Sequence, residues 1–161
     1  MQQNICDVKG IKCWGAHIGI KTSRRDLAII YSDNEAAGAA VFTRNIIKAA
    51  PVQVSQEHIK CGKIQAMVIV SGNANACTGE QGLEGAKAMV DVTAEMLGIE
   101  KELVFIACTG IIGKAFPTDK VVKGIRKNIV KLTDRPVAGT FAANAILTTD
   151  TFAKEGFLNF Q

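Results

Sequence analysis

Apolar residues along the chain form two patterns, which predict strands and helices. Short runs rich in β-branched and aromatic residues predict strands within 8–20 and at 27–32, 64–70 and 103–107. Apolar residues at helical spacing predict helices at 80–97 and 117–132, and an alanine-rich segment predicts a further short helix at 138–147. This mixture of strands and helices predicts an α/β fold.

Local signals set the expected ends of two helices. Thr78 and Gln81 have the spacing of a capping box at the start of the long helix, and Gly98 is expected to end that helix. Pro51 is expected to end any helix that begins at Asn45, because proline lacks the N–H that a helix interior needs.

The segment between the second and third predicted strands is expected to be mostly extended. Residues 39–43 predict a strand that forms a hairpin with 27–32. Ala50 is expected to be extended, since the residue before a proline is biased towards extended backbone. Residues 52–58 are expected to form a second short extended piece.

Length and composition limit the classes of protein to which the chain can belong. The 161 residues, 48% hydrophobic and 21% charged, supply a sizeable core, so we expect one domain over 1–161. A net charge of +4, scattered among acids with few aromatic residues, argues against nucleic-acid binding. Apolar runs are shorter than about 18 residues and the amino terminus lacks the order of a secretory signal, so we expect a cytoplasmic protein with no membrane span.

Cysteine and histidine positions argue against a disulfide framework and a metal site. The chain has 5 cysteines and no Cys-x-x-Cys pair, and the odd number favours reduced thiols. His17 and His58 are far apart and distant from any cysteine-rich cluster, so no metal is expected. No cofactor is expected either, because the glycine-rich loop before the long helix lacks the Gly-Lys-Ser/Thr pattern of a phosphate loop.

Three polar turns carry the candidate chemistry. Each follows an apolar segment, so the three can converge on one rim of the fold: 71–82, 108–113 and 148–151. Within the second turn, Gly110 and Gly113 permit positive φ and close approach to a ligand, and Thr109 adds a hydroxyl. Such a turn can hold an anion or a developing oxyanion, although turns of this composition also arise for steric reasons alone.

The chain offers no activated nucleophile. His17 and His58 lie outside the three turns, so no Ser-His-Asp or Cys-His set is formed by the motifs. Cys108 adjoins the central turn but has no neighbouring base in the sequence, and a cysteine in that setting is usually a small buried apolar residue. We assign it no chemistry.

Four sequence blocks resemble a known family, the self-cleaving glutamate N-acetyltransferases, also called ornithine acetyltransferases. The blocks occur in the family's order and cover most of the chain from about residue 26: Val-Phe-Thr-Arg-Asn (41–45) with Lys-Ala-Ala-Pro-Val (48–52), Ser-Gly-Asn-Ala-Asn-Ala-Cys-Thr-Gly (71–79), Thr-Gly-Ile-Ile-Gly (109–113) and Ala-Ile-Leu-Thr-Thr-Asp-Thr (145–151). The resemblance implies a layered mixed β-sheet with flanking helices, the fold shared with self-cleaving aminopeptidases.

The resemblance also implies an activity and site residues. The family transfers an acetyl group from N-acetylornithine to glutamate through an acetyl-enzyme, with Thr109 and Gly110 in the position of the oxyanion hole and Thr148 in the substrate site. It implies that the precursor cleaves itself before a threonine, which becomes the nucleophile of a carboxy-terminal (beta) subunit. The expected partner is therefore that subunit, in a hetero-oligomer.

The chain departs from the family pattern in two respects. The Lys-Gly-Ser-Gly-Met block and the Ala-Thr cleavage point that should follow 148–151 are absent, so the chain resembles a shortened amino-terminal (alpha) subunit that is expected to be inactive alone. Cys108 stands where the family commonly has a small hydroxyl residue. Two alternatives stay open: an inactive binding protein on the same scaffold, and a related aminopeptidase-type hydrolase.

Overall fold

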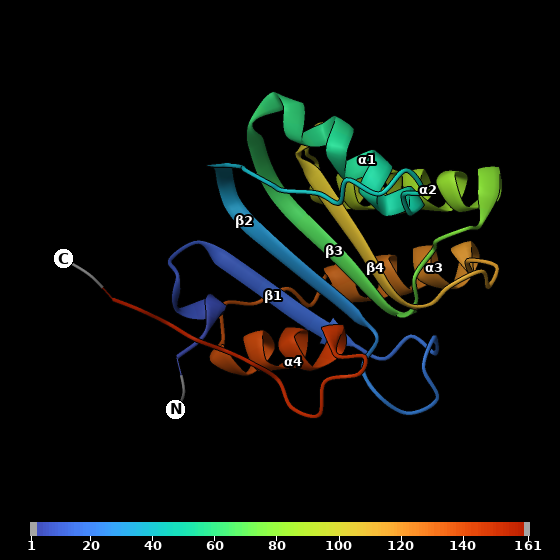
Figure 1. Ribbon diagram of the computed structural model, residues 1–161. Helices are drawn as coiled ribbons and strands as arrows, with labels where there is room; N and C mark the ends of the chain where they lie inside the picture. The colour runs from blue at the N-terminus through green and yellow to red at the C-terminus, as the bar shows by residue number, and fades with distance from the viewer. Residues whose placement is uncertain (1–2, 160–161) are drawn as a thin grey trace.

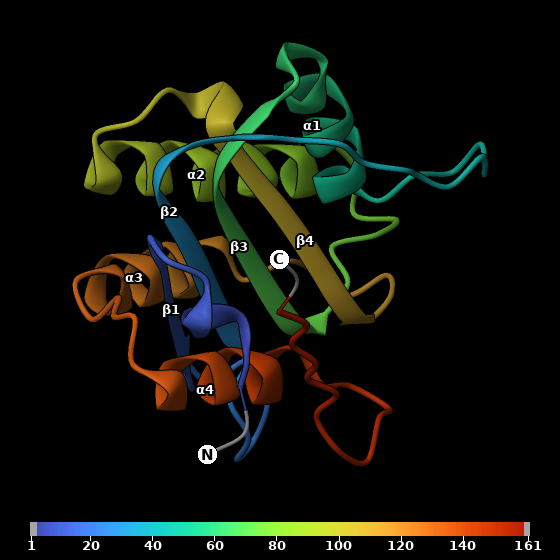
Figure 2. The same cartoon turned by 90° about the vertical axis from the view of Figure 1, so that its left-hand side faces the viewer.

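Alternate residues of the central strands pack against different helices, which gives the sheet a helical layer on each face. The computed structural model describes residues 3–159. Leu27, Ile29 and Val68 belong to the larger core with α1 to α3, whereas Ala28 and Ile69 pack in a second cluster with α4. Figures 1 and 2 show α4 on one side of the sheet and α2 and α3 on the other.

The sheet has four strands in the order in which they occur along the chain. They are β1 (Ile11–Ala16), β2 (Leu27–Ala37), β3 (Lys63–Asn73) and β4 (Val104–Ile111). β1 with β2 and β2 with β3 are antiparallel, while β3 and β4 are parallel and joined through a helix. The predicted α/β fold with a mixed, layered sheet is confirmed.

Four helices cover the sheet. They are α1 (Ala50–His58), α2 (Gly79–Leu97), α3 (Thr118–Ile129) and α4 (Pro136–Ile146), with short 3-10 turns at 5–7, 59–61 and 101–103. The helices predicted at 80–97, 117–132 and 138–147 are confirmed apart from their ends. Within residues 3–159, none of these helices is long and apolar enough to cross a membrane.

The predicted extended segments around Pro51 are wrong. Residues 39–43 form no strand, and the side chains of Val41 and Ile46 are almost fully exposed. Residues 52–58 belong to α1, whose first turn contains Pro51. Proline is accommodated there because the first N–H groups of a helix have no intrahelical partner, so it begins this helix instead of ending one.

The predicted capping box at the start of α2 is also wrong. The Thr78 hydroxyl donates to Asn75 Oδ1 at 2.8 Å and makes no cap hydrogen bond to the helix backbone. The Thr78 hydroxyl is therefore used within the preceding loop, as a donor to Asn75, and not as a helix cap. The predicted stop at Gly98 is confirmed, since this glycine adopts a left-handed φ of 67° after the last turn.

Helix α1 covers part of the outer edge of β4. The buried Ser55 hydroxyl donates to the Ile106 carbonyl at 2.9 Å and accepts from the Ile106 N–H at 3.1 Å. Nearer the start of the strand, His58 Nδ1 lies 2.7 Å from the Val104 carbonyl oxygen. The outward backbone groups of an edge strand need hydrogen-bond partners. Here side chains of α1 are those partners, in the place where the backbone of a neighbouring strand would otherwise lie.

Candidate active site

Two of the three polar turns meet because β3 and β4 are parallel. The strand register pairs Ser71 with Thr109 and Gly72 with Gly110, so the carboxyl ends of both strands lie side by side. Two further backbone bonds join the turns: Ala74 N–H donates to the Ile111 carbonyl at 2.9 Å, and Gly113 N–H donates to the Ala76 carbonyl at 3.0 Å. The predicted convergence of 71–82 with 108–113 is confirmed by these bonds.

Gly110 lies so close to β3 that no side chain fits there. A Cβ atom built on Gly110 would stand 2.5 Å from the carbonyl carbon of Gly72 and 2.7 Å from the nitrogen of Asn73. The φ of Gly110 is 131°, which L side chains rarely adopt. Both observations explain why glycine occupies this position. The close contact with β3 also fixes the position of the turn's exposed backbone.

Gly110 lies on an edge strand of the sheet. In a β-strand, the N–H and C=O of one residue point to one edge and those of the next residue to the other. Both groups of Ile106 bond to Ser55 and so face away from β3, whereas the Ile111 carbonyl faces β3 through its bond with Ala74. Gly110 is exposed near the end of β4, which is an edge strand.

Buried asparagines hold the first turn in shape. Asn73 Nδ2 donates to the Ala115 carbonyl at 3.0 Å, and Asn73 Oδ1 accepts from the Asn75 N–H at 2.8 Å. Asn75, with a left-handed φ of 46°, donates through Nδ2 to the Gly82 carbonyl at 2.9 Å. Within residues 3–159, no buried side-chain nitrogen or oxygen lacks a partner. The asparagines therefore position the turn and are not available to bind a ligand.

The third turn is tied to the first through the end of α4. The buried Ser71 hydroxyl donates to the Ala145 carbonyl, and Lys21 Nζ donates to the carbonyl of Leu147, the residue before Thr148. Thr148 itself is half-buried. Within residues 3–159, no hydrogen bond joins Thr148 directly to Thr109 or Gly110.

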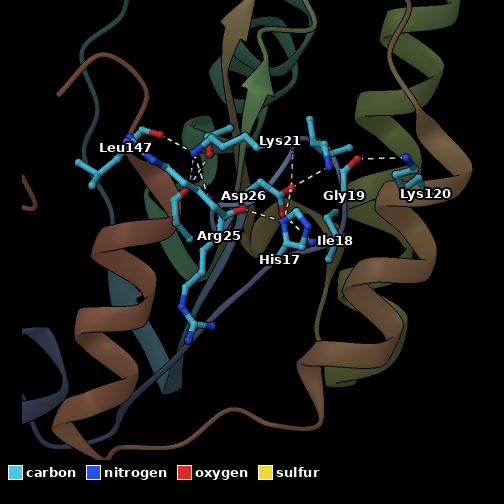
Figure 3. A network of polar contacts seen from close by, with 12 residues as sticks. His17, Ile18, Gly19, Lys21, Arg25, Asp26, Lys120 and Leu147 are labelled. Atoms are coloured by element: carbon cyan, nitrogen blue, oxygen red, sulfur yellow. Dashed lines mark hydrogen bonds and ion pairs between the residues drawn. The ribbon is translucent and has the colours of Figure 1, made fainter. Parts of the chain in front are cut away.

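A buried carboxylate organises the loop that carries Lys21, as Figure 3 shows. Asp26 is fully buried, and its carboxylate accepts the N–H groups of Ile18 at 2.6 Å, Ile20 at 2.7 Å and Lys21 at 2.9 Å. His17 Nδ1 lies 3.3 Å from the same carboxylate. In the sequence, residues 22–26 have the composition of a polar turn. An acidic residue directly before a buried strand is the one local signal that this loop is organised from within.

The chemistry of nucleophilic catalysis is not assembled within residues 3–159. His17 Nδ1 contacts the Arg24 carbonyl and the carboxylate of Asp26, and His58 Nδ1 contacts a backbone carbonyl, so neither histidine bonds a serine, threonine or cysteine side chain. Burial raises the pKa of the Cys108 thiol to about 12, and a backbone hydrogen bond to Val70 offsets this only in part. Within residues 3–159 the site therefore offers no activated nucleophile.

We expect Cys108 to resist alkylation in the folded protein. At pH 8 a thiol with a pKa of about 12 is thiolate in a fraction of about 10⁻⁴, whereas Cys61 and Cys77 are exposed. Iodoacetamide followed by peptide mass spectrometry should label Cys61 and Cys77 first and Cys108 only after denaturation. Labelling of Cys108 as fast as that of Cys77 in native protein would contradict this assignment, and denatured protein should label at all five cysteines as the control.

Comparisons with known proteins give one consistent result. The model of the ArgJ family matches residues 12–161. The arginine biosynthesis bifunctional protein ArgJ of Caldanaerobacter subterraneus subsp. tengcongensis is 51% identical over 153 residues, which are 95% of this chain and 38% of the relative. The protein named ArgJ 1 of Clostridium acetobutylicum is 44% identical over 99% of this chain and 39% of the relative. The chain thus spans less than half the length of these relatives.

Two crystal structures have the same fold. The arginine biosynthesis bifunctional protein ArgJ of Bacillus halodurans is 41% identical and superposes with a TM-score of 0.88, over 92% of this chain and 78% of that chain. The ornithine acetyltransferase of Mycobacterium tuberculosis, solved in complex with ornithine, is 35% identical with a TM-score of 0.89, over 92% of this chain and 81% of that chain. The similarity therefore extends over nearly all of the architecture described above.

Proposed function

The chain belongs to the ArgJ family, and on that premise we propose that it is the alpha-subunit part of an acetyltransferase of arginine biosynthesis. The reaction would move the acetyl group of N-acetylornithine to glutamate. The observation that carries the proposal is the Thr109–Gly110 turn, at the carboxyl ends of two parallel strands and with Gly110 exposed in the edge strand β4. Donors fixed in this way are suited to a tetrahedral acyl-transfer intermediate.

Each proposed residue has one role in this reaction. A threonine hydroxyl of the second subunit attacks the acetyl carbonyl and gives up its proton, and the Thr109 hydroxyl and the Gly110 N–H stabilise the resulting oxyanion. Collapse of the intermediate breaks the C–N bond, the leaving nitrogen takes up the proton that the threonine gave up, and ornithine leaves as the amine, with an acetyl-threonine ester remaining. The neutral amine of glutamate then attacks the ester and forms a second oxyanion. Its collapse breaks the bond between the acyl carbon and the threonine oxygen, which takes up the amine proton, and N-acetylglutamate leaves. Thr148 contacts the substrate in both steps.

The proposal requires a partner. Residues 3–159 assemble no activated nucleophile, and the chain spans 38% of its Caldanaerobacter relative, so the remaining part would supply the threonine. We propose that a precursor cleaves itself before this threonine and that the products form a cytoplasmic heterotetramer. In this proposal residues 1–161 are one domain of the larger self-processed enzyme, and this domain is inactive alone.

Acetyl transfer by the complete gene product tests the proposal. We expect it to convert N-acetylornithine and glutamate into ornithine and N-acetylglutamate without a cofactor, and the 161-residue chain alone to show no turnover. Ornithine release that does not depend on glutamate would identify a hydrolase instead. Absence of both reactions in correctly cleaved, folded protein would favour a binding protein on the same scaffold. Repeating the assay with acetyl-CoA would show whether it is a second donor.

A further inference from the structure

Helix α4 ends without a glycine cap, and two side chains from other elements supply what a cap would provide. The residue after the helix, Leu147, has extended backbone with φ −60° and ψ 136°, so its conformation does not turn the chain back over the last carbonyls. Ser71 Oγ donates to the Ala145 carbonyl, and Lys21 Nζ donates to the carbonyls of Ala145 and Leu147. A cation is favourable there because the carboxyl end of a helix dipole is negative.

Lys21 is itself held from both sides. Its backbone N–H donates to the buried Asp26 carboxylate at 2.9 Å, and its Nζ donates to the Arg25 carbonyl at 3.0 Å. Its side chain also passes over the strand ends, because a Cβ atom on Gly72 would meet Lys21 Cγ at 3.1 Å. Gly72 pairs with Gly110. One side chain therefore spans the distance between the β3–β4 turns and the residue before Thr148, as Figure 3 shows in part.

The ammonium group of Lys21 is committed to these carbonyls. Its Nζ donates to the carbonyls of Leu147 and Arg25, and the Ala145 carbonyl lies at 3.5 Å, the far limit of a hydrogen bond. Desolvation by burial lowers the pKa of Lys21, and the nearby Asp26 carboxylate acts in the opposite direction. Lys21 thus directs its ammonium group to backbone carbonyls and acts through the backbone that it holds.

We propose that Lys21 is a positioning residue that sets the place of Thr148 relative to the Thr109–Gly110 turn. The inference rests on the proposed function, in which Thr148 contacts the substrate. Asp26 fixes the loop, Lys21 fixes the end of α4, and the next residue along the chain is Thr148. Loss of the ammonium leaves the Leu147 carbonyl without this donor and lets the 148–151 turn move, while the oxyanion donors stay in place.

The test replaces Lys21 by methionine, which keeps most of the stem and removes the charge. In the complete gene product, Lys21→Met should raise KM for N-acetylornithine about 10-fold, the effect of losing roughly one substrate hydrogen bond, with kcat changed less than about 3-fold. Lys21→Arg, which keeps the positive charge, should raise KM for N-acetylornithine less than Lys21→Met does. Lys120→Met is the matched control, since Lys120 Nζ donates to the Gly19 carbonyl of the same loop but stands on α3, away from α4.

A double variant separates positioning from general damage. If Lys21 acts through Thr148, Lys21→Met should add less than about 2-fold to the KM of Thr148→Ala, because coupled residues are not additive. The same 10-fold increase in both backgrounds, or a fall in kcat with unchanged KM, would overturn the proposal. The second pattern is what a merely structural lysine would give.

One readout does not depend on acetyl transfer. Hydrogen exchange of the amides around 146–150 should be faster in Lys21→Met and unchanged in Lys120→Met. Exchange as slow as in the wild type would overturn the positioning role, whatever the activity. If the wild-type protein transfers no acetyl group but the two variants still show this difference in exchange, the proposed function is wrong. The contact between Lys21 and the end of α4 would nevertheless be established.

Discussion

Thr109→Ala is expected to lower acetyl-transfer turnover of the complete gene product by about 10²- to 10³-fold. One preorganised donor to a developing oxyanion contributes about 2.7–4 kcal/mol to transition-state stabilisation, and the alanine leaves only the Gly110 N–H. Thr109 is half-buried at the end of an edge strand, so its truncation should cost little stability. Steady-state kinetics with N-acetylornithine and glutamate measure the effect, and the thermal melting temperature checks the fold.

The conservative partner of this variant is Thr109→Ser, which keeps the hydroxyl and removes one methyl group. It should keep turnover within about 10-fold of the wild type. Wild-type turnover in Thr109→Ala would remove the hydroxyl from the mechanism. Equal losses in the serine and alanine variants would show that the methyl group, and hence packing, is what matters at this position.

Gly110→Ala is expected to destabilise the fold by about 3–5 kcal/mol. The new methyl group would stand 2.5 Å from backbone carbon of Gly72, and backbone atoms cannot move aside as a flexible side chain can. The φ of 131° adds strain for any L residue. Denaturant unfolding monitored by circular dichroism measures the change in the free energy of unfolding.

Gly113→Ala is the matched control, in the same turn and also at positive φ. A Cβ atom there meets nothing within 4 Å, and the φ is 74°, so only the conformational cost of about 1 kcal/mol remains. Similar destabilisation by both substitutions would contradict the claim that close contact with β3, beyond the backbone conformation, reserves position 110 for glycine.

Apolar periodicity predicted the layers of this fold but not the region around Pro51. Buried runs such as 64–70 and 103–107 determine strands because few other environments accept so many consecutive apolar residues. The segment 52–58 has no such run, and whether Pro51 begins or ends a helix depends on the backbone before it. Val41, within the strand predicted at 39–43, is almost fully exposed, and an apolar residue on a surface costs little by itself.

The parts of the site that come from strand ends were predictable, and the parts that come from distant contacts were not. Glycine, asparagine and threonine at 71–82 and 108–113 indicated special turns, and parallel pairing of β3 with β4 brings them together. The role of Asp26 depends on burial beneath a loop, and Lys21 reaches a carbonyl 126 positions away. No local pattern encodes a contact of that separation, so the sequence alone gives no sign of either role.

The cover that α1 provides over β4 has a consequence for self-association. Open sheet edges are the usual starting point for domain swapping and fibrous aggregation, because a second strand needs only unpaired N–H and C=O groups. Ser55 takes both groups of Ile106 and His58 takes the carbonyl of Val104, so a foreign strand finds no hydrogen-bonding register along the first half of β4. Among the hydrogen bonds of residues 3–159, α1 gives no such cover to the last residues of β4, the segment that carries Thr109 and Gly110.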